Sequence, residues 1–310
     1  MKQKIITVAL SPCWDRTIEI KNMNWGEHKI ITRQKISPAG KALNINKALA
    51  WMGEKSVAAG LWGQNDWNEM KRATDDLKNF VQIHFTRAKG KTRENITIID
   101  TAKRREIHLR SKSTIAEEES LSDLNRDLQR IITKNSICIF AGAMPGGKLL
   151  NKTIRLIQTA KKKGAKIVVD TSGKALKKIA AKGGLYIIKP NVEELGELVG
   201  KKIPNEKNAI ISAAKKLLKK TEFVLVSRAD KGAILIGRKT VLAAKYSGKA
   251  FDVYSAVGCG DFLLSGFIAE ICRTGDVKNA LQMGLKMATA KAFGLSEKLS
   301  RQQIDRKIKN

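Results

Sequence analysis

Apolar and polar positions along this 310-residue chain follow two periods, one typical of strands and one typical of helices. The first apolar run, Ile5–Leu10, has the length of a strand buried on both faces in a parallel sheet. From residue 116 onward, apolar runs predict strands over residues 136–140, 166–170, 185–189, 223–227 and 232–237. Helical spacing predicts helices over residues 117–134, 149–163 and 206–220, a short helix after residue 173, and three helices after residue 260. This alternation predicts a mostly parallel sheet covered by helices on both faces.

Four short alternating segments interrupt the first part of this pattern and predict a second, smaller sheet. They cover residues 17–21, 29–35, 95–100 and 105–110. Between them, Pro-Ala-Gly-Lys41 opens a predicted helix that Gly53 closes. We therefore expect one domain over residues 1–310, with a β lid formed by about residues 15–36 and 93–112. Because an exposed sheet of this size usually needs a partner to bury one face, we also expect a homodimer formed through the lid.

Composition narrows the class of protein. No apolar run approaches the roughly 20 residues of a membrane-spanning helix, and the N-terminal residues lack a signal-peptide apolar stretch. The four cysteines are widely spaced and form no CxxC pair. We expect reduced thiols, no zinc site and no membrane contact, as in a cytoplasmic protein.

The charge balance is unusual, because 59 Lys and Arg residues against 29 Asp and Glu residues give a net charge of +30. Such an excess is typical of proteins that bind nucleic acid. The lysines are nevertheless spread along amphipathic helices, only 5% of residues are aromatic, and no nucleic-acid-binding motif accompanies them. We therefore interpret the charge as a generally basic surface and do not expect nucleic acid as the main partner.

The segment from Ser255 to Phe267 carries the strongest candidate chemistry. Gly258 and Gly260 flank Cys259, Asp261 follows, and an apolar run at helical spacing begins directly afterwards. Glycines at the start of a helix let backbone N–H groups converge where the helix adds partial positive charge, so this segment predicts an anion hole. Beside such a hole, Asp261 could act as a base toward a hydroxyl. The alternative is an ordinary glycine-rich turn with Asp261 as a helix N-cap.

Two further positions suit ligand binding. Gly40 and Lys41 stand at the start of the predicted helix, where an anion would be stabilised. Asp15 lies in the loop that leaves the first strand, and ligands of open α/β sheets bind at such carboxyl-end loops. The alternative for Asp15 is a turn-forming residue. The Walker pattern GxxxxGK[ST] is absent, so a P-loop is not expected.

Together these segments resemble the ribokinase-like (PfkB) carbohydrate kinase family, in particular its branch of 1-phosphofructokinases and tagatose-6-phosphate kinases. Val257–Gly266 resembles the GAGD signature of the family, which implies Asp261 as the catalytic base and Gly258, Cys259 and Gly260 as the anion hole. Ala39–Asn46 resembles the GGKGxNVA motif, which implies sugar contacts from Gly40, Lys41 and Asn44. The resemblance covers essentially the whole chain and implies a three-layer α/β sandwich with a small β-sheet lid.

Further motifs extend the resemblance at both ends of the expected site. Asp15-Arg-Thr is similar to the DRT motif, whose acid holds sugar hydroxyls, and Thr92–Asn95 is similar to TRxN. The resemblance implies that Arg93 pairs with a phosphate already on the substrate, with Lys29 as a looser candidate for assistance. On the nucleotide side, the matches to KPNxxE and SxGxxGA imply ATP and Mg²⁺ contacts from Lys189, Asn191, Glu194, Ser227, Ala229 and Gly232. For Lys189, Asn191 and Glu194 the alternative is helix capping after a strand.

The chain also departs from the family pattern. Ala39 and Ala42 replace glycines of GGKG, Ser11 and Ala143 replace an asparagine and a serine, Ala229 replaces a glycine of the nucleotide loop, and Phe262 replaces the serine after GAGD. The base, the TRxN arginine and the KPN lysine are all retained. These replacements therefore bear on which sugar is used more than on the type of reaction. The position of the Cys259 thiol beside a helix start also suggests that it is unusually reactive.

Three functions follow, in order of preference. The first is an ATP- and Mg²⁺-dependent kinase that converts fructose 1-phosphate to fructose 1,6-bisphosphate, with tagatose 6-phosphate or fructose 6-phosphate as alternative acceptors. The second is a kinase of the same fold that acts on an unphosphorylated sugar or nucleoside. The third is a non-catalytic protein that binds sugar phosphates or nucleic acid, as the replaced glycines and the net charge suggest.

Overall fold

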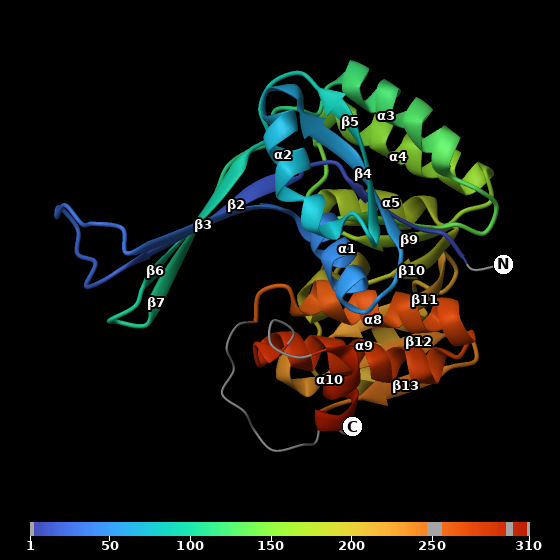
Figure 1. Ribbon diagram of the computed structural model, residues 1–310. Helices are drawn as coiled ribbons and strands as arrows, with labels where there is room; N and C mark the ends of the chain where they lie inside the picture. The colour runs from blue at the N-terminus through green and yellow to red at the C-terminus, as the bar shows by residue number, and fades with distance from the viewer. Residues whose placement is uncertain (1–2, 247–255, 296–299, 309–310) are drawn as a thin grey trace.

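The computed structural model describes residues 3–246, 256–295 and 300–308, and a nine-stranded sheet runs through this part of the chain (Figure 1). Its strands lie in the order β13 (Val241–Ala244), β12 (Ala233–Gly237), β11 (Thr221–Ser227), β10 (Leu185–Ile188), β9 (Lys166–Asp170), β8 (Ile137–Ala141), β1 (Ile5–Ala9), β4 (Ser56–Gly63) and β5 (Val81–Ala88). The strands from β5 to β11 are parallel, and β12 and β13 add an antiparallel edge. The mostly parallel sheet expected from the sequence is confirmed.

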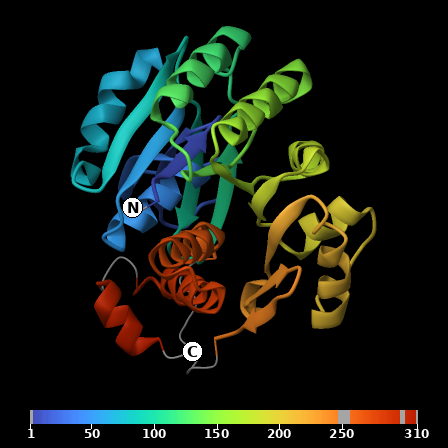
Figure 2. The same cartoon turned by 90° about the vertical axis from the view of Figure 1, so that its right-hand side faces the viewer.

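Helices cover both faces of this sheet, as Figure 2 shows. One layer contains α3 (Glu118–Ile131), α4 (Gly147–Lys162), α5 (Gly173–Lys182), α6 (Val192–Val199) and α7 (Lys207–Lys215). The opposite layer contains α1 (Lys41–Trp51), α2 (Trp67–Ala73), α8 (Cys259–Thr274) and α9 (Val277–Ala292). The last helix, α10 (Arg301–Lys307), packs Ile304 near Ala290 of α9. In the described residues, no helix is long and apolar enough to cross a membrane.

The first strand shows how the sequence produces this two-faced core. Ile6 and Val8 of β1 pack into the hydrophobic core under one helix layer, and Ile5 and Ala9 pack into the core under the other. Successive side chains of a strand point to opposite faces, so a central strand with apolar residues at both parities must be covered twice. The apolar run that predicted this strand is therefore a direct consequence of its central place in the sheet.

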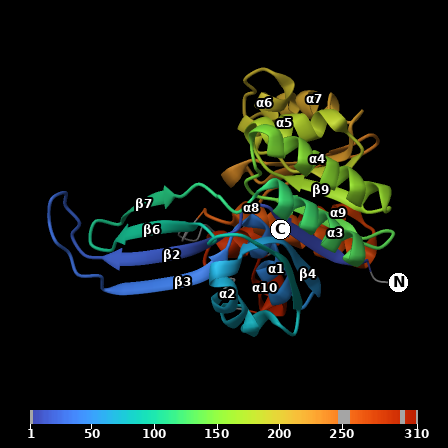
Figure 3. The ribbon, with the colours of Figure 1, turned by 90° about the horizontal axis from the view of Figure 1, so that it is seen from above.

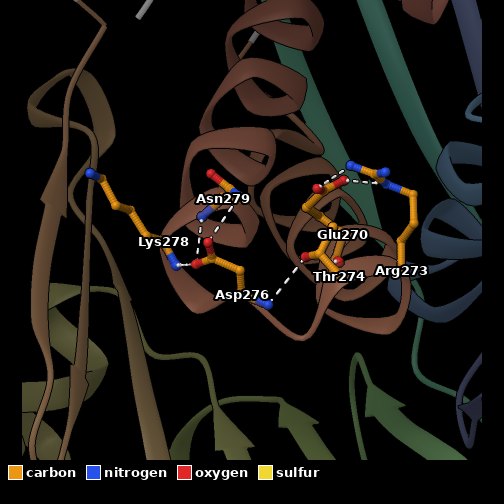
Figure 4. Close-up of polar contacts among 6 residues, drawn as sticks. All are labelled: Glu270, Arg273, Thr274, Asp276, Lys278 and Asn279. Atoms are coloured by element: carbon orange, nitrogen blue, oxygen red, sulfur yellow. Dashed lines mark hydrogen bonds and ion pairs between the residues drawn. The ribbon is translucent and has the colours of Figure 1, made fainter.

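The turn between α8 and α9 is held by polar contacts at both helix ends (Figure 4). Asp276 caps α9, because its side chain accepts hydrogen bonds from the backbone N–H groups of Lys278 and Asn279. In the last turn of α8, Arg273 forms an ion pair with Glu270. These contacts stabilise the helical hairpin whose first helix starts at the glycine motif.

The small sheet extends away from the main body (Figures 1 and 3). Its strands lie in the order β3 (Arg33–Ala39), β2 (Cys13–Ile20), β6 (Glu94–Asp100) and β7 (Arg105–Arg110). Asp15 lies opposite Ser37 and Asn95, and Asn95 lies opposite Arg110. Residues directly opposite one another share a face, so Asp15, Asn95 and Arg110 lie on the same side of the small sheet.

The predicted elements were wrong in three places. Asp15 lies within β2, not in a loop or a turn, because β2 begins at Cys13, soon after β1 ends. Residues 29–32 belong to the connection between β2 and β3, because the pairing of these strands runs from Cys13 opposite Ala39 only to Glu19 opposite Arg33. The strands are thus shifted toward the main body relative to the expected segments. The region between residues 54 and 92 contains β4, α2 and β5, none of which was predicted. The assignment of the small sheet as a lid stays a prediction.

Candidate functional site

A cavity of about 500 Å³ lies where the carboxyl ends of the parallel strands meet the starts of α1 and α8. Its walls include residues that follow β1, β8, β9 and β10, together with residues from the small sheet. This volume is in the range of small-molecule sites, and the carboxyl edge of a parallel sheet is where α/β proteins bind ligands.

Most of the predicted site residues line this one cavity. They are Asp15, Gly40, Lys41, Asn44, Arg93, Lys189, Asn191, Glu194, Ser227, Gly258, Gly260 and Asp261. Four predicted residues do not line it: Lys29, Cys259, Ala229 and Gly232. Lys29 lies in the connection between β2 and β3, where it forms an ion pair with Glu27. The structure thus brings together residues that are up to about 250 positions apart in the chain.

Asp261 lies in the first turn of α8 and lines the cavity. It is only 4% exposed, and its Oδ2 atom accepts a hydrogen bond from Asn44 Nδ2 at 3.0 Å. Burial, followed by the nearby negative charge of Asp170, raises the pKa of Asp261 to about 6. A carboxylate with such a pKa is largely ionised at neutral pH but binds protons more strongly than an exposed aspartate. It is therefore suited to accept a proton from a hydroxyl.

Asp170, at the end of β9, is a charged residue beside the cavity that the sequence interpretation missed. Its side chain is fully buried, and it pairs with Lys41 Nζ at 2.8 Å and with Lys189 Nζ at 3.1 Å. Burial alone would raise the pKa of Asp170, but Lys189 and Lys41 outweigh burial and hold that pKa below its usual range. Burial likewise opposes the charge of Lys41, yet Asp170 and then Asp261 raise the pKa of this lysine. Asp170 thus keeps two cations fixed at the cavity wall.

The start of α8 has the geometry expected of an anion site. Gly258 adopts a left-handed conformation with φ of 81°, which glycine tolerates best. A Cβ atom at Gly260 would lie 3.2 Å from Lys189 Nζ, so the missing side chain lets this ammonium group approach the helix start. Within the described residues, the backbone N–H groups of Gly258 and Gly260 donate to no acceptor. These donors, the helix dipole and Lys189 all favour a negatively charged ligand.

The suggestion of a reactive Cys259 thiol is contradicted. Burial raises the pKa of this thiol, which lowers the fraction of thiolate. Cys259 is the first residue of α8, and its thiol does not line the cavity. Its backbone N–H donates to the Ala256 carbonyl at 3.4 Å, so the predicted contribution of Cys259 to the anion hole stays a prediction.

The small sheet supplies the opposite end of the cavity. Asp15 Oδ1 accepts a hydrogen bond from Asn95 Nδ2 at 3.1 Å and a weaker one from the Cys13 thiol at 3.3 Å. Arg93 donates to neutral oxygens only, the side-chain carbonyl of Asn95 and the backbone carbonyls of Ser111 and Ser11, while its buried Nε–H has no partner within the described residues.

Arg110 also lines this end of the cavity and was not predicted as a site residue. It ends β7, and within the described chain its side chain forms no hydrogen bond or ion pair. Two guanidinium groups without a carboxylate partner therefore lie on the side of the small sheet that faces the cavity. Such a pair suits an anionic group such as a phosphate.

The residues on the predicted nucleotide side also have structural roles. Asn191 and Glu194 form a reciprocal capping box at the start of α6, with hydrogen bonds of 2.8 and 2.9 Å. The alternative of helix capping is thus correct for these two residues, although both also line the cavity. Ala229, which replaces a glycine of the family motif, has φ of 52°. A left-handed alanine costs about 1 kcal/mol, which explains why glycine is usual there.

Sequence signals for the two missed residues existed. Asp170 ends a predicted strand and is followed by Thr-Ser-Gly173, so the rule that placed Asp15 in the site applies equally to Asp170. Arg110 ends a predicted strand of the small sheet. Its pairing with Asn95 depends on a strand register that the sequence alone does not specify.

The fold and this cavity define a class, the α/β enzymes that handle anionic substrates at the carboxyl edge of a parallel sheet. The sequence matches the family described as pfkB family carbohydrate kinase over residues 9–295. The chain therefore belongs to the pfkB family of carbohydrate kinases, which transfer a phosphoryl group to a hydroxyl.

Individual relatives agree with this assignment. The chain is 28% identical to a 1-phosphofructokinase of Bacillus subtilis, over 97% of this chain and 95% of the relative. It is 24% identical to a tagatose-6-phosphate kinase of Staphylococcus epidermidis, over 96% and 93% of the two chains. Its structure is similar to that of phosphofructokinase-2 from Escherichia coli in complex with fructose-6-phosphate, with a TM-score of 0.89, 22% identity, and coverage of 99% and 98%. The ribokinase-like fold expected from the sequence is thereby confirmed.

Proposed function

We propose that the protein is a cytoplasmic, ATP-dependent kinase that phosphorylates a hydroxyl group of a sugar phosphate, with fructose 1-phosphate as the preferred acceptor. One observation carries this proposal: a buried carboxylate, Asp261, shares a single cavity with two separate groups of cations. Lys41 and Lys189 pair with Asp170, whereas Arg93 and Arg110 lie on the side of the small sheet, near Cys13. A phosphoryl-transfer site for two anionic substrates needs this division.

The arginine end supports a phosphorylated acceptor over a plain sugar. Arg93 and Arg110 face the cavity without a carboxylate partner, and a phosphate is the group whose charge and oxygens suit two guanidinium forks. The names of the relatives, 1-phosphofructokinase and tagatose-6-phosphate kinase, point to the same class of acceptor. Asp15 and Asn95 lie beside this end and are suited to hold sugar hydroxyls.

In the proposed reaction, Asp261 accepts the proton of the acceptor hydroxyl, and the hydroxyl oxygen forms a bond to the terminal phosphorus of ATP. The bond between that phosphorus and its bridging oxygen breaks, ADP leaves, and Asp261 releases its proton to solvent. The start of α8 and Lys189 stabilise negative charge on the transferring group. Asn44 holds the carboxylate of Asp261 in place through its hydrogen bond.

The residues present fit a magnesium ion held mainly by the nucleotide. In the described chain, no group of three or more His, Cys, Asp or Glu residues could form a protein metal site. Magnesium in kinases is commonly bound by one or two carboxylates, substrate phosphates and water. Glu194 lines the cavity and is the candidate carboxylate, acting through water. The ion would neutralise charge on the ATP phosphates.

The test is an ADP-release assay with Mg-ATP and five acceptors: fructose 1-phosphate, fructose 6-phosphate, tagatose 6-phosphate, fructose and ribose. We expect turnover with a phosphosugar. Replacement of Arg93 or Arg110 by Ala should raise the KM for that phosphosugar at least about 10-fold, because each loses a charge-assisted contact. The KM for ATP should change less than about 2-fold.

Arg105→Ala is the matched control for Arg110→Ala. Arg105 is an exposed arginine at the opposite end of β7, the strand that Arg110 ends. It removes the same charge without touching the cavity. Higher kcat/KM for fructose or ribose than for every phosphosugar would favour the unphosphorylated-sugar kinase instead. ATP binding without turnover of any acceptor would favour a non-catalytic protein.

We also propose that the protein is a homodimer formed through the small sheet. The face opposite to the cavity carries the exposed apolar residues Ile36, Ile107 and Leu109, which are 42, 37 and 46% exposed. Such an apolar sheet face is stabilised when a second copy covers it.

Light scattering after size exclusion should show twice the mass of the chain at micromolar concentration. Ile107→Lys should shift the protein toward the monomer, because a charge would be buried in the interface. Thr97→Lys, on the other face of the same sheet, is the control. A monomeric wild-type protein at these concentrations contradicts the proposal.

A further inference from the structure

Asp66 is a buried carboxylate outside the cavity that joins three separate segments. It is 1% exposed and ends the short 3₁₀ helix η1 (Gln64–Asp66) that follows β4. Its Oδ2 atom accepts hydrogen bonds from the indole N–H groups of Trp14, at 2.5 Å, and Trp62, at 3.0 Å. Its Oδ1 atom accepts a hydrogen bond from the backbone N–H of Thr92 at 2.9 Å. The carboxylate thus satisfies three donors with two oxygens.

Two of these donors adjoin residues of the cavity. Trp14 directly precedes Asp15, and Thr92 directly precedes Arg93. The backbone N–H of Trp14 also donates to the Arg93 carbonyl at 2.9 Å, so the two segments are held together where β2 and β6 leave the main body. A shift of either segment relative to Asp66 would therefore move a residue of the cavity wall.

The packing around Asp66 leaves little freedom for such a shift. The backbone N–H of Gly63 donates to the Thr92 hydroxyl at 2.9 Å, and a Cβ atom at Gly63 would lie 2.5 Å from Thr92 N and 2.6 Å from Asp66 Oδ1. The Trp14 and Trp62 rings meet edge to face, with centroids 5.6 Å apart. Burying a carboxylate costs free energy unless its oxygens are well satisfied. In the described part of the chain, the donors to Asp66 are all neutral N–H groups.

We propose that Asp66 is a positioning residue that sets the spacing of Asp15 and Arg93, and with it the affinity for the phosphorylated acceptor. This inference rests on the proposed function. Within the described residues, Asp66 forms no hydrogen bond with a residue that lines the cavity, and it acts through Trp14 and Thr92. It connects the main sheet to the acceptor end only, so its effect should be selective for one of the two substrates.

The test is Asp66→Asn, which keeps the size of the side chain but turns one acceptor oxygen into a donor NH₂ group. That NH₂ group must face either the Thr92 N–H or the indole N–H groups of Trp14 and Trp62. Because two donors cannot pair, the segment that it faces moves away. We expect the KM for the phosphosugar to rise about 10-fold, the KM for ATP to change less than about 2-fold, and kcat to fall less than the acceptor kcat/KM.

Thr86→Val is the control for a general loss of stability. It removes a partly buried hydrogen bond, from the Thr86 hydroxyl to Asp127 at 2.7 Å, on a strand that does not contribute to the cavity. Its melting midpoint should fall by about 2 °C with both KM values unchanged. The indole N–H resonances of Trp14 and Trp62, observed by NMR with labelled tryptophan, should move in Asp66→Asn and stay in Thr86→Val.

The possible outcomes separate the two proposals. A wild-type protein without turnover of any phosphosugar contradicts the proposed function. A wild-type protein with turnover, combined with an Asp66→Asn variant that melts earlier but keeps its acceptor KM, contradicts the positioning role. Equal increases in the KM for the acceptor and the KM for ATP also contradict the positioning role. A residue that positions only the acceptor end should change the KM for the acceptor alone.

Discussion

Asp261 and Asp170 are two buried carboxylates beside the same cavity, yet their surroundings shift their pKa values in opposite directions. Burial raises the pKa of Asp261 to about 6, and the nearest hydrogen-bond donor given by the structure is the neutral amide of Asn44. Asp170 is buried at least as deeply, but Lys41 and Lys189 hold its pKa below the usual range. The difference therefore lies in the cations and not in the burial.

This contrast assigns different roles to two residues of the same type. Asp261, with a raised pKa, can exchange a proton near neutral pH, whereas Asp170 stays charged and anchors two lysines. The negative charge of Asp170 also contributes to the raised pKa of Asp261. Asp170 thus helps to raise the pKa of the proposed base, Asp261, without itself lining the cavity.

The largest expected effect is a fall in kcat in the Asp261→Asn variant. Loss of the proposed base should lower kcat about 10³-fold, within the range usual for general-base removal. The wild-type kcat should fall below a midpoint near pH 6, because the protonated carboxyl cannot accept the hydroxyl proton. Both are measured by ADP release at saturating ATP and acceptor.

Asp276→Asn is the matched control for this change, since Asp276 caps α9 away from the cavity and Asn is an equally good cap. Its kcat should equal that of the wild type. Retention of more than a tenth of wild-type kcat by Asp261→Asn would exclude this residue as the base and remove the contrast with Asp170.

Much of the fold could be predicted from the sequence because it depends on local periodicity. The run Ile5–Leu10 and the helix–strand alternation after residue 116 both carry their pattern in consecutive residues. The β4 segment was missed because Ser56–Gly63 contains two glycines and two alanines, whose small side chains give a weak apolar pattern. Gly60 is needed there, since a Cβ atom would lie 2.0 Å from the Ala9 carbonyl oxygen. The need for glycine at this position comes from the neighbouring strand β1, so the residues around Gly60 in the sequence do not reveal it.

The site was predictable where chemistry is carried by a short motif and not where it depends on distant pairing. Gly258–Asp261 and Arg93 could be found from the motifs that contain them. Asp170 pairs with a lysine 129 residues away, and Arg110 reaches the cavity through the register of β7 with β6. Lys29 was assigned by a loose match, and the structure places it outside the cavity wall.

A smaller effect is expected on the free energy of unfolding, which should rise in Asp261→Asn and fall in Asp170→Asn. The raised pKa of Asp261 means that ionising it in the folded protein costs free energy, a cost absent below the unfolded pKa of about 4 and complete above about 6. Asp261→Asn should therefore stabilise the protein by about 3 kcal/mol at pH 7.5 and by little at pH 4. Asp170→Asn should instead destabilise it by about 3 kcal/mol at pH 7.5, because two lysines lose their buried counter-ion.

Urea unfolding of the two variants and the wild type at pH 4 and pH 7.5 measures these differences directly. The lowered pKa of Asp170 means that its contribution is present above the unfolded pKa and is lost as the pH falls through the folded one. The gain in unfolding free energy of Asp261→Asn should thus shrink as the pH falls. The loss in unfolding free energy of Asp170→Asn should be present at pH 7.5, whether or not the variant is active. If both variants lost stability at pH 7.5, Asp261 would be a structural carboxylate like Asp170. Its low exposure would then reflect packing and not the preparation of a base.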